Sequence, residues 1–70
     1  MKEITSTMAG TVFNVLISQG EEVQVGQQVL VLESMKMEIP VESSVAGKVL
    51  EMKVNIGDFV NEGDVLVVIE

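Results

Sequence analysis

Glu33–Glu38, with the sequence ESMKME, lies between two copies of one sequence pattern, and this arrangement decides the fold. A shift of 37 residues superimposes identical residues of the two halves. Among the matched pairs are Ala9 and Ala46, Gly10 and Gly47, Val12 and Val49, Gly20 and Gly57, Val23 and Val60, Gly26 and Gly63, Val31 and Val68, and Glu33 and Glu70. All six glycines fall into these pairs. Because glycine is used where the backbone needs a positive φ or a close approach, we expect paired turns in two copies of one supersecondary unit, joined by residues 34–45.

The apolar residues show no helical periodicity. They occur in short β-branched runs separated by glycine-containing turns. The pattern predicts an all-β chain with strands at Glu3–Ser6, Thr11–Ile17, Glu22–Val23, Gln28–Glu33, Glu38–Val41, Gly47–Val54, Phe59–Val60 and Asp64–Ile69. Pro40 lacks an N–H group, so its strand is expected to lie at a sheet edge or to be irregular at this residue. Two interlocked four-stranded repeats predict a flattened eight-stranded barrel-sandwich hybrid with approximate twofold symmetry.

The comparison of the two halves also indicates which side chains point inward. The expected core positions of the long strands are Val15 and Ile17 in the first copy and Met52 and Val54 in the second. Leu16 matches Lys53 and is therefore expected to point outward. Val12 lies three residues before Val15, which breaks strict alternation and predicts a bulge or a bend around Phe13, with a matching one around Leu50.

Composition limits what this chain can do. Its 70 residues make one small domain, and its 47% hydrophobic residues include two phenylalanines but no Trp or Tyr, so the core is expected to be aliphatic. A chain this short buries only about 60% of its unfolded surface, so we expect nearly every apolar side chain to be buried. Without cysteine or histidine, disulfides, thiolate sites, the usual general base and the commonest metal ligand are all missing. We therefore expect no catalytic site and no metal site.

The net charge of −7, with four lysines and no arginine, argues against binding to nucleic acid or to anionic membranes. Basic or mixed protein surfaces are the expected partners. No apolar stretch approaches the roughly 20 residues that span a bilayer, and polar residues follow the start where a signal peptide would be apolar. We expect a cytoplasmic protein.

Lys36 stands at the centre of the repeat, on the predicted tip of a hairpin. The first copy enters this turn after Glu33, whereas its counterpart Glu70 ends the chain, so the termini are expected at the opposite end of the domain from Lys36. An exposed tip on a rigid scaffold suits a side chain that must enter several active sites in turn. The alternative is an ordinary solvated turn lysine.

Met35-Lys36-Met37, between Glu33 and Glu38, resembles the attachment motif of biotinyl domains, which share a superfamily with lipoyl domains. Met8-Ala9-Gly10-Thr11-Val12 is similar to the start of the barrel in biotin carboxyl carriers, and the loops Gly20–Gly26 and Gly57–Gly63 match as well. The resemblance covers essentially all 70 residues. Some biotin carriers insert a protruding loop in the first copy, but the equal glycine spacing here leaves no room for it.

The resemblance implies that residues 1–70 form one monomeric biotinyl domain without catalytic activity of its own. It further implies biotin joined by an amide to Lys36, with a biotin protein ligase, a biotin carboxylase and a carboxyltransferase as partners. The domain would carry carboxylate for a biotin-dependent carboxylase. Acetyl-CoA or another acyl-CoA carboxylase, as in fatty acid biosynthesis, is the first candidate, and pyruvate or other carboxylases are the second.

The residues beside Lys36 have two interpretations each. Met35 and Met37 could pack in the core, but two large apolar residues beside a hairpin tip are hard to bury together, so we expect one of them to be exposed for recognition by the ligase. Glu33 and Glu38 are either solubilising charges or groups that orient or screen the lysine for its ligase.

Two other functions remain open from the sequence. A lipoyl carrier domain for acyl transfer has the same fold, but lipoyl motifs resemble Asp-Lys-Ala where this chain has Met35-Lys36-Met37. An unmodified barrel-sandwich interaction module, of the kind found in transporter adaptor proteins, has no need of a lysine at the repeat centre. An intact-mass spectrum distinguishes these alternatives.

Overall fold

The computed structural model describes all residues, 1–70, as eight β-strands connected by turns. The strands are β1 (Lys2–Thr5), β2 (Gly10–Val15), β3 (Glu22–Val23), β4 (Gln28–Ser34), β5 (Met37–Glu42), β6 (Gly47–Met52), β7 (Phe59–Val60) and β8 (Val65–Ile69). None of the elements is a helix of the length and hydrophobicity that crossing a bilayer requires.

All eight predicted strands are present, but some bounds differ. β2 ends at Val15 and β6 at Met52, two residues earlier than predicted. The Leu16 N–H still donates to the Val29 carbonyl of β4 at 2.9 Å, and the chain then crosses to the other copy, where the Gly20 N–H donates to the Val49 carbonyl at 2.9 Å. The remaining bounds agree within one residue.

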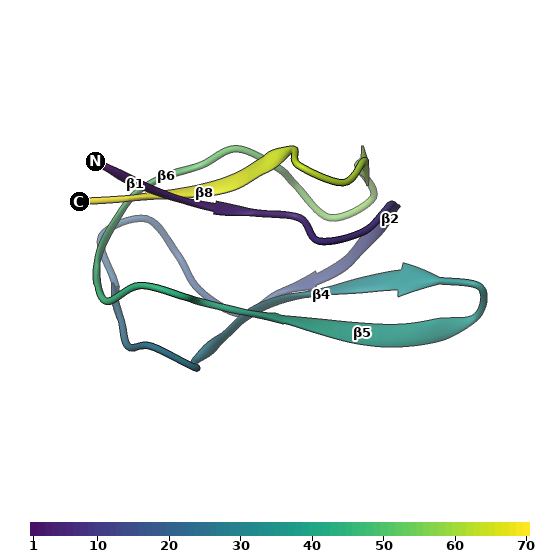
Figure 1. Cartoon of the computed structure of the whole chain (residues 1–70), viewed down its shortest axis with the longest axis horizontal. Coiled ribbons are helices and arrows are strands. Elements are labelled where there is room, and N and C mark those ends of the chain that lie inside the picture. Colours follow the sequence, from purple (N-terminus) through teal and green to yellow (C-terminus); the bar gives the residue numbers. More distant parts are fainter.

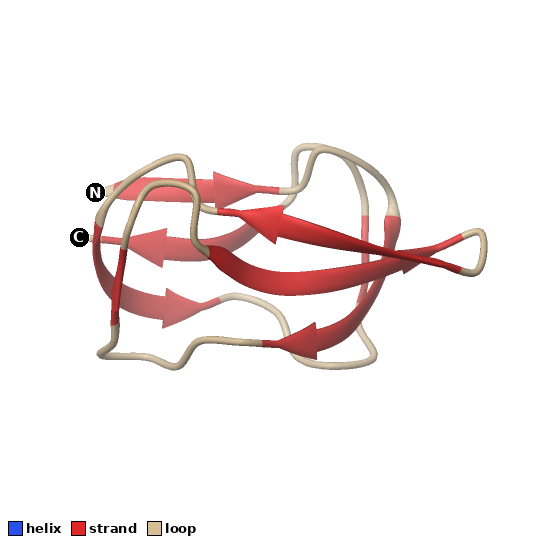
Figure 2. Cartoon of the chain, turned by 90° about the horizontal axis from the view of Figure 1, so that it is seen from below, coloured by secondary structure: helices blue, strands red, loops and turns tan.

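The strands form two four-stranded antiparallel sheets, with the orders β1-β8-β6-β3 and β5-β4-β2-β7 (Figures 1 and 2). The sheets enclose one core in a body of 31 × 17 × 17 Å. This arrangement confirms the predicted flattened barrel-sandwich. β5, which contains Pro40, lies at a sheet edge as predicted, so no ladder hydrogen bond to a further strand is lost.

The two copies are interlocked rather than side by side. β1 of the first copy pairs with β8 of the second, and β5 of the second pairs with β4 of the first. The turns cross over in the same way, because the Gly26 N–H donates to the Ser43 carbonyl and the Gly63 N–H donates to the Ser6 carbonyl, both at 2.8 Å. Each half therefore completes the sheet of the other.

Bulges set the inward and outward faces of the long strands. The register shifts between Val12 and Asn14, which confirms the bulge predicted at Phe13, and it shifts again between Val49 and Glu51. The core is aliphatic and is centred on fully buried side chains of both sheets, among them Val12, Leu30, Leu32, Val49, Val67 and Ile69. Of the expected core positions, Ile17 and Val54 are buried, whereas Val15 and Met52 pack against the core and are only partly buried. Leu16 is exposed, as predicted.

The expectation that nearly every apolar side chain is buried is wrong. Eight large hydrophobic residues are exposed, namely Met1, Phe13, Leu16, Val25, Met35, Met37, Ile56 and Phe59. The physical reason is that two packed sheets cover only their inner faces, so Phe13 and Phe59, which point outward, stay in water. Five of the other residues lie outside the strands, at the N-terminus or in turns and connections.

The glycine pairs also divide into two kinds. Gly20 and Gly57 lie in turns with φ values of 93° and 97°, and Gly26 and Gly63 behave alike, as the repeat predicts. The third pair starts strands instead of forming turns. A Cβ at Gly47 would lie 2.7 Å from the Glu70 carbonyl oxygen, so close approach of the backbone requires glycine at this position.

Candidate functional site

The β4–β5 hairpin projects from the body at one end of the molecule (Figures 1 and 2). Thr11 is the last residue of β2 in register with β4, opposite Glu33, whereas the hairpin continues to the pair Ser34 and Met37. Met35 and Lys36 form the two-residue loop. The loop therefore lies beyond the neighbouring strand, with solvent around it.

Both loop residues have left-handed backbone conformations, with φ of 52° at Met35 and 63° at Lys36. Two positive φ values in a two-residue hairpin loop are typical of a type I′ turn, whose twist matches the flanking strands and which favours Asn-Gly. Neither Met nor Lys prefers this conformation, which costs each residue on the order of 1–2 kcal/mol. The strain persists because the paired strands impose the turn, and it sets the direction of the Lys36 side chain.

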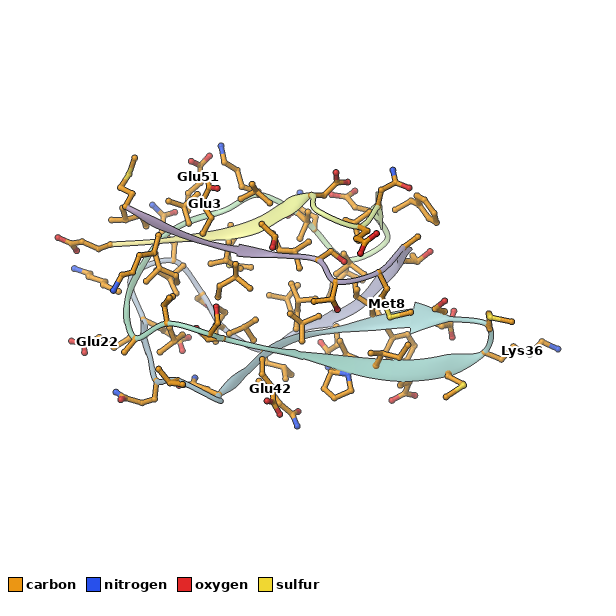
Figure 3. All side chains as sticks on the ribbon, in the orientation of Figure 1. Glu3, Met8, Glu22, Lys36, Glu42 and Glu51 are labelled. Atoms are coloured by element: carbon orange, nitrogen blue, oxygen red, sulfur yellow. The ribbon has the colours of Figure 1, made fainter.

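The Lys36 side chain is exposed and extends away from the hairpin (Figure 3). Its amine has no ion-pair partner, because the single ion pair of the chain joins Lys53 to Glu51 at 3.3 Å. Lys2 is also engaged, since its Nζ donates to the Ala46 carbonyl at 2.6 Å. The Lys36 amine can thus be acylated without breaking any contact that the fold uses.

Both methionines beside the lysine are exposed, Met35 at 92% and Met37 at 63%. We expected only one of these two methionines to be exposed. Both are exposed because the loop lies beyond the body of the domain, where neither side chain can reach the core. Met8, from the stretch that leads into β2, is the methionine that packs against the core (Figure 3). An apolar rim therefore flanks the Lys36 amine.

Glu33 and Glu38 lie directly opposite each other on β4 and β5, and both are exposed. Like charges in directly opposed positions are mildly destabilising, and neither carboxylate forms an ion pair with Lys36. Direct ion pairing therefore does not orient the lysine in this structure. The pair places negative charge at the base of the projecting hairpin.

The structure contains no pocket and no cluster of three or more metal-ligating side chains. What the hairpin offers is one free amine at the tip of a rigid arm, at the opposite end from both termini, as the repeat predicts (Figure 1). An amine so placed fits a group that is attached through a carboxyl carbon.

Residues 2–69 match the family described as "Biotin-requiring enzyme". A biotin/lipoyl attachment protein of Bacillus subtilis is 49% identical over 63 residues, which are 90% of this chain and 86% of that protein. A biotinylated protein TB7.3 homolog of Mycobacterium leprae is 38% identical over 68 residues, 97% of this chain and 96% of that protein. A biotin carboxyl carrier protein of acetyl-CoA carboxylase from Solanum lycopersicum is 42% identical over 60 residues, 86% of each chain.

A solved structure, the urea carboxylase of Kluyveromyces lactis, has a TM-score of 0.90 at 30% identity. The match covers 99% of this chain but only 6% of that enzyme, so the fold here corresponds to one small part of a large carboxylase. The short relatives, by contrast, are matched over most of their length. The family match over residues 2–69, together with these relatives, shows that the chain belongs to the biotin/lipoyl attachment family described as "Biotin-requiring enzyme".

Proposed function

We propose that Lys36 carries biotin through an amide and that the domain carries carboxylate between the biotin carboxylase and carboxyltransferase sites of a biotin-dependent carboxylase. The observation that supports this proposal is the free, exposed amine at the tip of the projecting β4–β5 hairpin. The relatives named biotin carboxyl carrier and biotinylated protein support biotin as the group. The chain acts as a carrier and leaves catalysis to its partners.

The modification is an acylation. A biotin protein ligase joins the biotin carboxyl carbon to the Lys36 Nζ after activating that carboxylate, which loses one oxygen with the activating group. The ammonium gives up two protons as the amide forms, so one positive charge disappears. When bound, biotin supplies the nitrogen that accepts and releases carboxylate.

The chain's own residues supply reach and direction. The lysine stem and the five-carbon acyl arm together extend roughly 14 Å at about 1.25 Å per bond, which is enough to enter a cleft from the domain surface. The strained loop at Met35 and Lys36 fixes where this arm starts. Because the termini lie at the other end of the molecule, a tether there leaves the hairpin unobstructed.

An acyl-CoA carboxylase is our first candidate for the enzyme served, and the name of the tomato relative supports it. Lipoyl attachment is the second candidate for the modification, because the Bacillus subtilis relative is named for both groups. The methionines that flank Lys36, in place of the acidic residue and alanine of lipoyl motifs, favour biotin.

Mass spectrometry tests the proposal directly. Incubation with biotin, ATP and biotin protein ligase is expected to add one biotinyl group, which peptide mapping places on Lys36. The variant Lys36→Arg is expected to fold and to remain unmodified. Lys48→Arg is the matched control, because Lys48 is an exposed lysine in β6 away from the hairpin, and it is expected to be modified normally. Biotin on Lys48 or Lys53 of the folded wild type, or lipoyl alone on Lys36 in the native host, contradicts the proposal.

A further inference from the structure

The outer face of the sheet that carries Lys36 exposes two phenylalanine side chains, Phe13 and Phe59. In the row closest to the loop, Phe59, Thr11, Glu33 and Glu38 lie opposite one another on β7, β2, β4 and β5, so their side chains share one face. In the next row Asn14 and Pro40 lie opposite Val31, and Phe13 is the additional residue beside Asn14 at the bulge. We call Phe13, Val31, Pro40 and Phe59 the apolar face.

This face is open to solvent. Phe59 is 65% exposed and Phe13 is 47% exposed, Pro40 is exposed, and Val31 is partly buried. Ile56, in the turn that leads to β7, is also exposed, and Gly57 beside it donates its N–H to the Val12 carbonyl at 2.8 Å. The exposure of two large aromatic side chains to water is unfavourable. A partner that packs against them would bury up to about 150–250 Å² of surface per side chain.

The internal repeat provides a control for what the fold itself requires. The equivalent positions on the other sheet are Glu22 for Phe59, Leu50 for Phe13, Val68 for Val31 and Glu3 for Pro40. That face carries glutamate at two of these four positions, and Glu3 and Glu51 lie on either side of Val68 in the register of β1, β8 and β6. Because the same backbone accepts glutamate where this sheet has Phe59 and Pro40, folding does not require an apolar side chain at these two positions.

The apolar face is continuous with the proposed attachment site. Strands in a sheet lie about 4.8 Å apart, so Phe59 on β7 lies roughly 10 Å from Glu33 and roughly 14 Å from Glu38 along the row. The Lys36 loop begins at Met35, two residues beyond Glu33. Any protein that takes the Lys36 side chain into a cleft from this side therefore covers the apolar face at the same time.

We infer that the apolar face docks the enzyme that carboxylates the group on Lys36, an inference that rests on the proposed function. Such an enzyme must bind bicarbonate and a nucleoside triphosphate, which are both anions, so lysine and arginine are expected around the entrance of its site. A basic rim complements the Glu33 and Glu38 carboxylates, and an apolar hollow beside it receives Phe59. Two rows on four strands cover far less than the ~800 Å² per partner of a stable interface, which suits a contact that is made and broken in each cycle.

A second copy of this chain does not fit the face as well. Self-association would bring the Glu33 and Glu38 rows of two chains near each other, and each chain has a net charge of −7. The same small area also falls short of what a stable dimer buries.

The test begins with the apo chain, so that it does not depend on biotinylation. The ¹⁵N-labelled chain is titrated with a biotin carboxylase subunit purified from the source organism, and amide signals are followed by NMR. Signals of Thr11, Phe13 and Phe59 are expected to broaden, whereas that of Val25, in the turn that precedes β4, is expected to stay sharp. Unchanged signals on the apolar face at saturating subunit overturn the inference.

Kinetics with the biotinylated chain provide the second measurement. Phe59→Glu, which installs the residue of the equivalent position Glu22, is expected to raise the KM for the carrier about tenfold and to leave kcat within about twofold. Phe59→Thr, a neutral strand former, is expected to act in the same direction. Val25→Glu is the matched control, because Val25 is 69% exposed, matches Glu62 in the repeat and gives the same change of charge away from the hairpin.

The outcomes separate this inference from the proposed function. If mass spectrometry finds biotin on Lys36 but the Phe59 variants keep the wild-type KM, the docking inference fails and the carrier function stands. If the Phe59 variants slow only the ligase reaction, or convert a dimer into a monomer by light scattering, another occupant covers the face and the inference is overturned. Absence of biotin from Lys36 contradicts the proposed function but leaves the NMR result interpretable.

Discussion

Met35 and Met37 expose large apolar surface beside the Lys36 amine, although nothing in the fold requires them there. A ligase that recognises the loop as a surface gains contacts from both side chains. The double variant Met35→Asp, Met37→Ala is expected to lower the kcat/KM of biotinylation at least tenfold. Its Tm is expected to stay near that of wild type, because aspartate tolerates the left-handed backbone at position 35 better than methionine does. Incorporation is followed by mass for biotin and for lipoyl ligase separately. Undiminished biotinylation of the folded variant would mean that the ligase reads the position of the lysine and not the methionines.

Leu16 and Val54 test the assignment of faces at single residues. Leu16 is 45% exposed, whereas Val54 is 8% exposed and belongs to the core. Leu16→Glu is expected to change the free energy of unfolding by only about 0.5 kcal/mol, and Val54→Glu to lower it by about 3 kcal/mol or more, because it buries an unpaired charge. Urea denaturation measures both. Val15→Glu is expected to fall between them, since Val15 is partly buried. A loss at Leu16 as large as at Val54 would contradict the inward and outward faces described above.

The turns are the elements in which the repeat makes its clearest prediction. Gly20 and Gly57 have φ values of 93° and 97°, and a Cβ built at either position meets no atom within 4 Å. Gly20→Val and Gly57→Val therefore add backbone strain without a clash, and each is expected to cost about 1–3 kcal/mol. In a domain of this size each kcal/mol lowers Tm by about 4–8 °C, so thermal unfolding resolves the losses. The two losses are expected to be similar, and one variant that melts like wild type would show that the two turns do not bear equal strain.

At the scale of the whole molecule, the long axis of 31 Å separates the termini from the Lys36 loop (Figure 1). A folded protein fused to either terminus is therefore expected to leave the kcat/KM of biotinylation within about twofold of the unfused chain. The control is insertion of the same protein between Met35 and Lys36, where it disrupts the loop and is expected to abolish modification. Ligase assays on the three proteins provide the measurement. A large loss with both terminal fusions would mean that the ligase contacts the terminal end of the domain as well.

The sequence predicted much of the fold because the repeat makes each half a check on the other. Matched valines and glycines located the eight strands within two residues and the bulges at Phe13 and Leu50, since these features depend on local alternation and on backbone freedom. The same symmetry placed Lys36 opposite the termini, and its flanking motif indicated the family.

Only the tertiary structure decided the features that depend on what lies across the sheet or beyond it. The left-handed turn at Met35 and Lys36 goes against the preference of both residues, because the twist of the paired strands imposes it. The exposure of both methionines follows from how far the hairpin extends past β2, which alternation along one strand does not reveal. In the same way, the row from Phe59 to Glu38 joins residues far apart in the chain, so an apolar face beside the attachment loop becomes visible only when the two interlocked copies are paired in register.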